Sequence, residues 1–164
     1  MQSPWMLAPL MLTPLLLANL AGCTANSVAG TPAYGNLLAA LVPAQESGIA
    51  DDAAVRLAAS YPPAQTRFAL QHAAQDGFGT GLLARLRAQG YAIAEFSDQT
   101  PAAAPSQPAA AEAIALRYVL DMAAPPGLAR LTLYAGGESL SRAYLLDEGA
   151  ARPASAWIRR EAAP

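Results

Sequence analysis

The sequence predicts an α+β fold, a small sandwich of about five mostly antiparallel strands with two helices on one face. Two segments place apolar side chains at helical spacing, and five others alternate apolar and polar side chains. The last three alternating segments are joined by short turns rich in proline or glycine, which favours an antiparallel meander. With 164 residues, the chain has about the length of one domain.

The first predicted helix covers residues 50–61, and Pro62-Pro63 is expected to end it. Asp51 and Asp52 are expected in its first turn, where the helix dipole favours negative charge. Its apolar positions are Ala54, Leu57, Ala58 and Tyr61.

The second predicted helix begins after Asp76, a residue type that caps helix N-termini, and ends before Gly90, which fits the position after a helix. Its apolar face consists of Phe78, Leu82, Leu83 and Leu86. The five predicted strands cover residues 66–72, 91–97, 113–122, 128–135 and 139–146. The tail that carries Arg159 and Arg160 is expected to be frayed. The alternative is that these arginines, beside Trp157, contact lipid headgroups or a partner.

The N-terminal segment has the pattern of an export leader. From Trp5 to Gly22 the chain carries no charge and is rich in Leu, Met and Ala. The tetrapeptide Leu20-Ala21-Gly22-Cys23 resembles the bacterial lipobox, in which a diacylglycerol is attached to the cysteine thiol and a peptidase cuts before it. Lipid attachment also explains why a single cysteine suffices. Residues 1–22 contain no Lys or Arg, which departs from the usual leader.

Two other interpretations of this segment stay open. The first is an uncleaved membrane helix, because the uncharged run is just long enough, although Pro9 and Pro14 disfavour a helix there. The second is a buried structural cysteine. On the preferred interpretation, residues 1–22 are a lipoprotein signal peptide and residues 23–48 are the lipidated N-terminus and a flexible tether. Residues 49–164 are then the α+β domain, with a low-complexity loop at 98–112.

Composition excludes several classes of function. The net charge is −2 and the pI about 5.3, so no nucleic-acid partner is expected. There is no lysine, which excludes a P-loop lysine and Schiff-base chemistry. One histidine and one cysteine cannot build a multi-histidine or Cys/His metal site. Catalysis would have to use carboxylates, hydroxyls or tyrosines, so composition disfavours an enzyme, and we expect no cofactor and no small-molecule substrate.

Residues 77–95 have the outline of a dinucleotide-binding loop, with a glycine-rich turn between a predicted strand and a predicted helix. Gly77 and Gly79 fit the motif, but Leu82 stands in place of the third glycine. Close packing of the helix against the sheet explains Gly79 and Gly81 better. His72 is expected to be solvated or hydrogen-bonded rather than a ligand. "GESLS" at 137–141 is only loosely similar to a nucleophile elbow and lies between two strands.

Several segments together resemble the TrbH family, lipoproteins of bacterial conjugal-transfer (type IV secretion, mating-pair formation) operons. They are "LAGC" at 20–23, "SYPPAQTRFAL" at 60–70, "DGFGTGLLARLRAQGYAIAEF" at 76–96, "ALRYVLD" at 115–121, "RLTLYAGGESLSRAY" at 130–144 and "SAWIRRE" at 155–161.

The resemblance implies a structural or assembly component of the transfer apparatus, without enzymatic activity. Its expected partners are membrane lipid, through acylated Cys23, and other protein subunits of the transfer complex. Thr24, where an aspartate would favour retention in the inner membrane, favours the outer membrane facing the periplasm. Two alternatives remain: an envelope lipoprotein that regulates a cell-wall enzyme, and a nucleotide-dependent enzyme that uses residues 77–95.

Overall fold

The computed structural model describes residues 34–38, 41–96, 113–124 and 127–161. Within these residues the chain forms two α-helices and one eight-stranded sheet, together with a short 3₁₀ turn at Pro63–Gln65. The helices are α1 (Pro43–Ser60) and α2 (Gly77–Ala88). The strands are β1 (Gly35–Asn36), β2 (Arg67–Leu70), β3 (Ala92–Ala94), β4 (Ile114–Ala123), β5 (Leu128–Ala135), β6 (Glu138–Asp147), β7 (Ala150–Pro153) and β8 (Ile158–Glu161).

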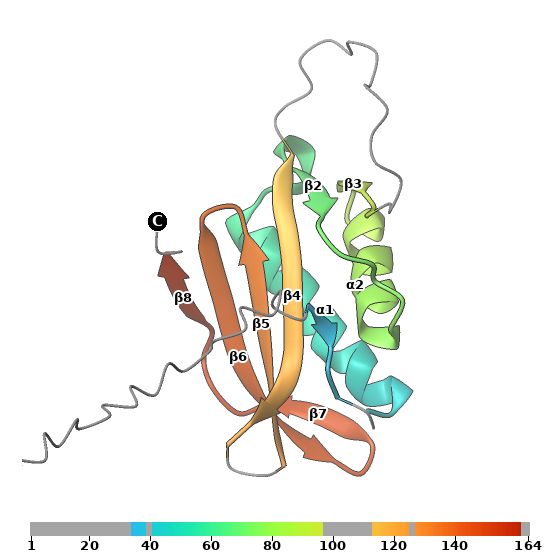
Figure 1. The fold of residues 1–164 in the computed structure, drawn as a ribbon, viewed down its shortest axis with the longest axis vertical. Coiled ribbons are helices and arrows are strands. Elements are labelled where there is room, and N and C mark those ends of the chain that lie inside the picture. The colour runs from blue at the N-terminus through green and yellow to red at the C-terminus, as the bar shows by residue number, and fades with distance from the viewer. Residues whose placement is uncertain (1–33, 39–40, 97–112, 125–126, 162–164) are drawn as a thin grey trace, which may run out of the picture. The chain divides into compact units, whose positions relative to one another are not determined.

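The long strands β4, β5 and β6 form an antiparallel meander at the centre of the sheet. Two short strands, β1 and β2, lie along the free edge of β4 and run parallel to it, and β3 pairs with β2 in parallel. At the other side, β7 and β8 pair with opposite ends of β6, along the edge that faces away from β5. Figure 1 shows β8 at the left of the sheet and β7 at its lower end. The sheet order is therefore β3-β2-β4-β5-β6-β7, with β1 beside β4 and β8 beside β6.

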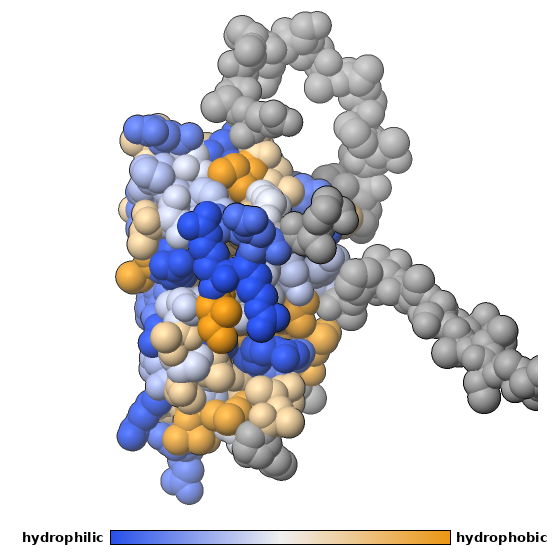
Figure 2. Space-filling view, turned by 90° about the vertical axis from the view of Figure 1, so that its left-hand side faces the viewer, coloured by the Kyte–Doolittle hydropathy of each residue, from blue (hydrophilic) through white to orange (hydrophobic). Residues whose placement is uncertain are grey.

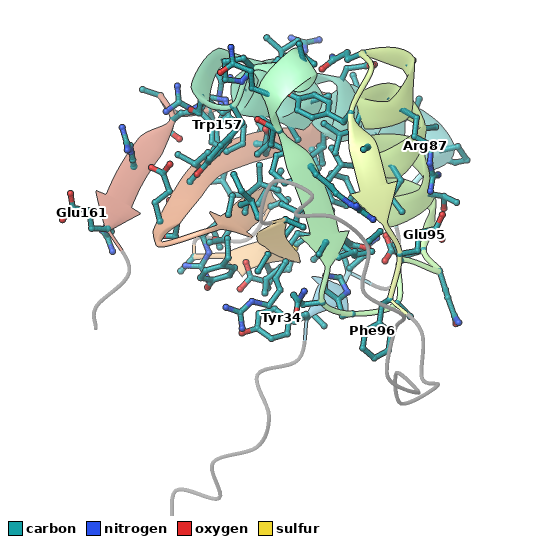
Figure 3. All side chains as sticks on the ribbon, turned by 90° about the horizontal axis from the view of Figure 1, so that it is seen from above. Tyr34, Arg87, Glu95, Phe96, Trp157 and Glu161 are labelled. Atoms are coloured by element: carbon teal, nitrogen blue, oxygen red, sulfur yellow. The ribbon has the colours of Figure 1, made fainter. Side chains whose placement is uncertain are left out.

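Both helices cover the same face of the sheet, as Figures 1 and 3 show. Alternate residues of the strands point toward the helices and are buried there, in accordance with the two-residue period of a strand. The resulting core combines aliphatic and aromatic side chains, and its largest fully buried members are Ile49, Leu57, Phe68, Phe78, Leu82, Leu86, Leu116, Tyr118, Leu120, Leu131, Leu133 and Tyr144. The predicted α+β class, with two helices on one face of a mostly antiparallel sheet, is confirmed.

Local signals explain the limits of α2. The Asp76 side chain accepts a hydrogen bond from the Gly79 N–H at 2.7 Å, which satisfies one of the free donors of the first turn. Gly90 follows the helix with a φ of 92°, a conformation that costs glycine little. The predicted cap and the predicted terminating glycine are both confirmed.

The structure corrects the expected start of α1. The helix begins at Pro43, within the predicted tether, so Asp51 and Asp52 lie well beyond its first turn. Proline fits the first helical position because its missing N–H needs no partner there. The Gln45 side chain accepts from the Val42 N–H at 3.1 Å and donates to the Asp147 carbonyl at 2.6 Å, which fixes the helix start against the end of β6.

Three strands were not expected from the sequence. β1 lies within the segment predicted as a tether. β7 lies in a C-terminal segment for which no strand was predicted, and β8 lies in the tail predicted to be frayed. The expectation of a frayed end at Arg159 and Arg160 is wrong, because both residues pair with β6. The low-complexity loop predicted at 98–112 lies outside the described residues.

Candidate interaction surface

The residues predicted to carry the lipid anchor, Cys23 with Leu20, Ala21 and Gly22, lie outside the described residues. That prediction therefore stays a prediction. No helix that the structure describes combines the length and the apolar character needed to cross a membrane.

The glycine-rich segment before α2 is explained by packing. A Cβ at Gly79 would clash with the Tyr118 hydroxyl and the Ala74 methyl group, so the glycine lets α2 approach β4 closely. This confirms the packing explanation for Gly79. Gly81 differs, because a Cβ there would meet Arg85 of α2 itself and Ala50 of α1 rather than the sheet.

Two carboxylates already lie at the N-terminus of α2. Asp76 caps the helix and accepts a hydrogen bond from the Tyr118 hydroxyl at 2.7 Å. A Cβ at Gly77 would clash with the Glu46 carboxylate, which places that group beside the same turn. Negative charge is stabilised there by the helix dipole, and the site is thus filled by side chains of the chain itself. A pyrophosphate would meet two like charges at this position.

His72 is hydrogen-bonded, as predicted. Its Nε2 accepts a hydrogen bond from the Tyr118 backbone N–H at 3.3 Å, while Nδ1 lies 3.2 Å from the Ala73 carbonyl oxygen. Partial burial lowers the pKa of His72, because it disfavours the charged imidazolium, and the nearby Asp76 opposes this effect only in part. These contacts explain His72 without a metal, and the described residues contain no group of three or more His, Cys, Asp or Glu that could hold one.

The segment at 137–141 does not form a nucleophile elbow. Gly137 is in the β5–β6 turn and the following residues belong to β6. Glu138 points to the helix side, where it accepts a hydrogen bond from the Tyr61 hydroxyl and forms an ion pair with Arg159. Ser139 and Ser141 point to the other side of the sheet and line a hollow.

The face of the sheet turned away from α1 and α2 is here called the outer face. Where β8 lies beside β6, this face encloses a shallow hollow of about 490 Å³. Hydroxyl groups and guanidinium groups line it, with two aliphatic side chains among them. The lining residues are Val119, Asp121, Arg130, Thr132, Tyr134, Ser139, Ser141, Ile158 and Arg160. Figure 2 shows the adjoining edge of the molecule, where hydrophilic side chains gather around isolated hydrophobic ones.

The outer face carries an excess of positive charge. Strand alternation and register place five arginines and two aspartates on it, an excess of three positive charges on a chain with a net charge of −2. Both aspartates are paired, Asp121 with Arg130 at 2.6 Å and Asp147 with Arg152 at 3.0 Å. The arginines are Arg67, Arg117, Arg130, Arg152 and Arg160.

Tyr34 is fixed on this same face. Its ring stacks on His72 with 5.8 Å between ring centroids, and it meets Tyr134 edge-on at 6.0 Å. The Arg117 guanidinium lies 5.0 Å from the ring centroid of Tyr34 and donates to its hydroxyl at 3.0 Å. Figure 3 shows Tyr34 on the side of the sheet opposite the helices. The chain therefore enters the described domain on the outer face.

Of the arginines on the outer face, sequence reasoning singled out Arg160 alone, and it expected that residue in a frayed tail. A signal was present in β4, where Arg117 and Asp121 alternate with apolar residues and so belong to a polar face. That signal does not show which strands lie beside β4. The neighbourhood of Arg160 and Ser139 depends on the pairing of β8 with β6.

These features define a class of protein, a small α+β domain with an open, arginine-bearing sheet face. The family model for conjugal transfer protein TrbH matches residues 26–161. The chain therefore belongs to the TrbH family, which confirms the resemblance drawn from the sequence and makes the protein a component of conjugal transfer. No curated protein and no solved structure matches the chain.

Proposed function

We propose that this protein is a lipid-anchored, periplasm-facing lipoprotein that helps to assemble or stabilise a bacterial conjugative transfer apparatus of the type IV secretion class. The observation that carries the proposal is the TrbH family match over residues 26–161, which begins three residues after Cys23. Lipid on Cys23, the one cysteine of the chain, would hold the domain at the bilayer.

 Acylation would modify the Cys23 thiol without the need for a second cysteine, and several acyl chains together anchor a protein stably.

The described domain suits a role in binding rather than in chemistry. Its helix side is closed by a continuous core and by polar links between α1 and the sheet, such as Arg142 with Asp52. Its outer face instead offers arginine and tyrosine side chains to solvent, residue types that are enriched at interfaces. A component of an assembly needs such a surface held by a rigid support.

Metabolic labelling with radioactive palmitate tests the anchor. We expect the wild type and a Ser27→Ala control to be labelled and to fractionate with the outer membrane, and we expect Cys23→Ser to be unlabelled. In a donor strain that lacks the native gene, Cys23→Ser should transfer the plasmid no better than the deletion does. Equal labelling of all three proteins would contradict the proposal.

The assembly role needs a second experiment. Crosslinking of the lipidated protein in donor-cell envelopes, followed by affinity purification, should recover other subunits of the transfer apparatus. Recovery of cell-wall enzymes in their place would support the regulatory alternative and contradict the assembly role.

A further inference from the structure

We infer that the outer face of the sheet lies against the anionic phospholipid headgroups of the membrane that anchors the protein. The domain would then lie face-down on the bilayer, with α1 and α2 turned away from it. This inference rests on the lipid anchor at Cys23 proposed above.

The first argument is the distribution of charge. The outer face has an excess of three positive charges, whereas the other described charged groups, five arginines and eight carboxylates, have an excess of three negative charges. The domain is therefore strongly dipolar across the sheet. An anionic surface attracts the outer face and repels the helix side, which orients the domain.

The second argument is the path of the chain. Cys23 and Tyr34 are separated by eleven residues, which span at most about 40 Å when fully extended. Tyr34 is held on the outer face by Arg117 and Tyr134. A lipid at Cys23 is therefore connected to the domain through the side that carries the positive charge.

The third argument is the chemistry of the surface. Arg160 and Arg67 form no ion pair with any described residue, so their guanidinium groups are available for phosphate. Thr132 and Ser141 add hydroxyl groups in the hollow. Tyr134 has the amphipathic ring that is favoured at headgroup level. An acidic segment of a protein partner is the competing occupant.

The test uses the lipidated protein in vesicles. Because Cys23 is the one cysteine of the chain and is consumed by acylation, an introduced cysteine gives a unique site for a fluorescent label. Leu145→Cys places the label on the outer face and Val55→Cys places it on α1, at positions where the native side chains are 45% and 64% exposed. The vesicles contain phosphatidylcholine with or without phosphatidylglycerol, and a trace of lipid with a nitroxide quencher on its headgroup.

We expect strong quenching of the label at position 145 and weak quenching at position 55, and only in vesicles that contain phosphatidylglycerol. Raising the salt from about 0.1 M to about 1 M should relieve the quenching, because the Debye length falls from about 10 Å to about 3 Å. Removing two charges by Arg67→Gln and Arg160→Gln should lower the ratio of face-down to free domains by roughly 30-fold, at roughly fivefold for each arginine.

A matched control removes the same charge from α2. Arg85→Gln with Arg87→Gln should leave the quenching unchanged, and thermal unfolding checks that every variant is folded. Equal quenching at both labels, in a protein that still floats with the vesicles, overturns the orientation and leaves the lipid anchor intact. A protein that does not float with the vesicles overturns both the lipid anchor and the orientation of the domain. An outer-face label that stays unquenched in vesicles but crosslinks to an envelope protein in donor cells assigns the face to a protein partner and overturns the inference.

Discussion

Arg142 of β6 donates from Nη1 to both carboxylate oxygens of Asp52 in α1, at 2.8 and 2.9 Å. The Tyr144 hydroxyl donates to the same carboxylate at 2.6 Å. The Arg142 and Asp52 side chains are 20% and 24% exposed, so water screens this pair only in part. Burial, and then the hydrogen bond to Asp52, raise the pKa of Tyr144 well above its usual range. The three side chains join the first helix to the last long strand.

Replacing Asp52 by alanine should lower the free energy of unfolding by about 2–4 kcal/mol, because Arg142 and the Tyr144 hydroxyl then lose their common partner. Urea denaturation measures the change. Asp121→Ala is the control, since it breaks the more exposed pair with Arg130 and should cost no more than about 1 kcal/mol. Equal losses in the two variants would contradict a special role of Asp52.

Gly79→Ala should destabilise the fold by about 1–3 kcal/mol, because the added methyl group meets the Tyr118 hydroxyl and Ala74 in a filled region. Gly137→Ala is the matched control, since nothing lies within 4 Å of a Cβ there. Thermal unfolding of both variants separates the effect of crowding from the general effect of replacing glycine. A Gly79→Ala protein as stable as the control would show that α2 can shift away from β4 at no cost.

Stability should fall as the pH drops below about 7. The folded state favours neutral His72, because burial lowers the pKa of its imidazole. As the pH falls, the imidazole is therefore protonated in the unfolded chain before it is protonated in the folded chain. The loss begins near the ordinary histidine pKa of about 6.5 and continues down to the lower pKa of the folded state. Asp76 and Arg117 are the charged groups that act on the ring. A His72→Gln variant should lack this dependence, so parallel stability curves for the two proteins between about pH 7 and pH 5 would refute the assignment.

Gln45→Ala should cost about 1–2 kcal/mol, because the Val42 N–H and the Asp147 carbonyl both lose their side-chain partner at a buried position. Hydrogen exchange should also become faster in the first turn of α1. Gln65→Ala, at an exposed position, serves as the control and should change stability by less than about 0.5 kcal/mol. Unchanged exchange in Gln45→Ala would mean that Pro43 alone determines the helix start.

The sequence predicted the elements whose signals are local. The second helix carries its cap at Asp76, its apolar face and its terminating Gly90 within one short segment, and the structure confirms all three. The meander from β4 to β6 was predicted for the same reason, since alternation and turn residues are properties of neighbouring positions.

The missed elements depend on partners far along the chain. β1, β7 and β8 contain two to four residues each, too few for a pattern, and they exist because the edges of β4 and β6 offer backbone partners. The start of α1 had a weaker local signal, Pro43 followed by Gln45, but Val42 is not a residue type that usually caps a helix. The outer face likewise required the strand order, because its arginines come from five different strands.

The way β7 and β8 share one edge of β6 has a consequence for solubility. Together they occupy the backbone donors and acceptors along most of that long strand, which would otherwise be a template for pairing with another chain. The edge that remains consists of two short pieces, and one of them carries Arg159, Arg160 and Glu161. Deleting β8 should therefore promote aggregation through the uncovered Glu138–Ser141 backbone, even if the core stays folded.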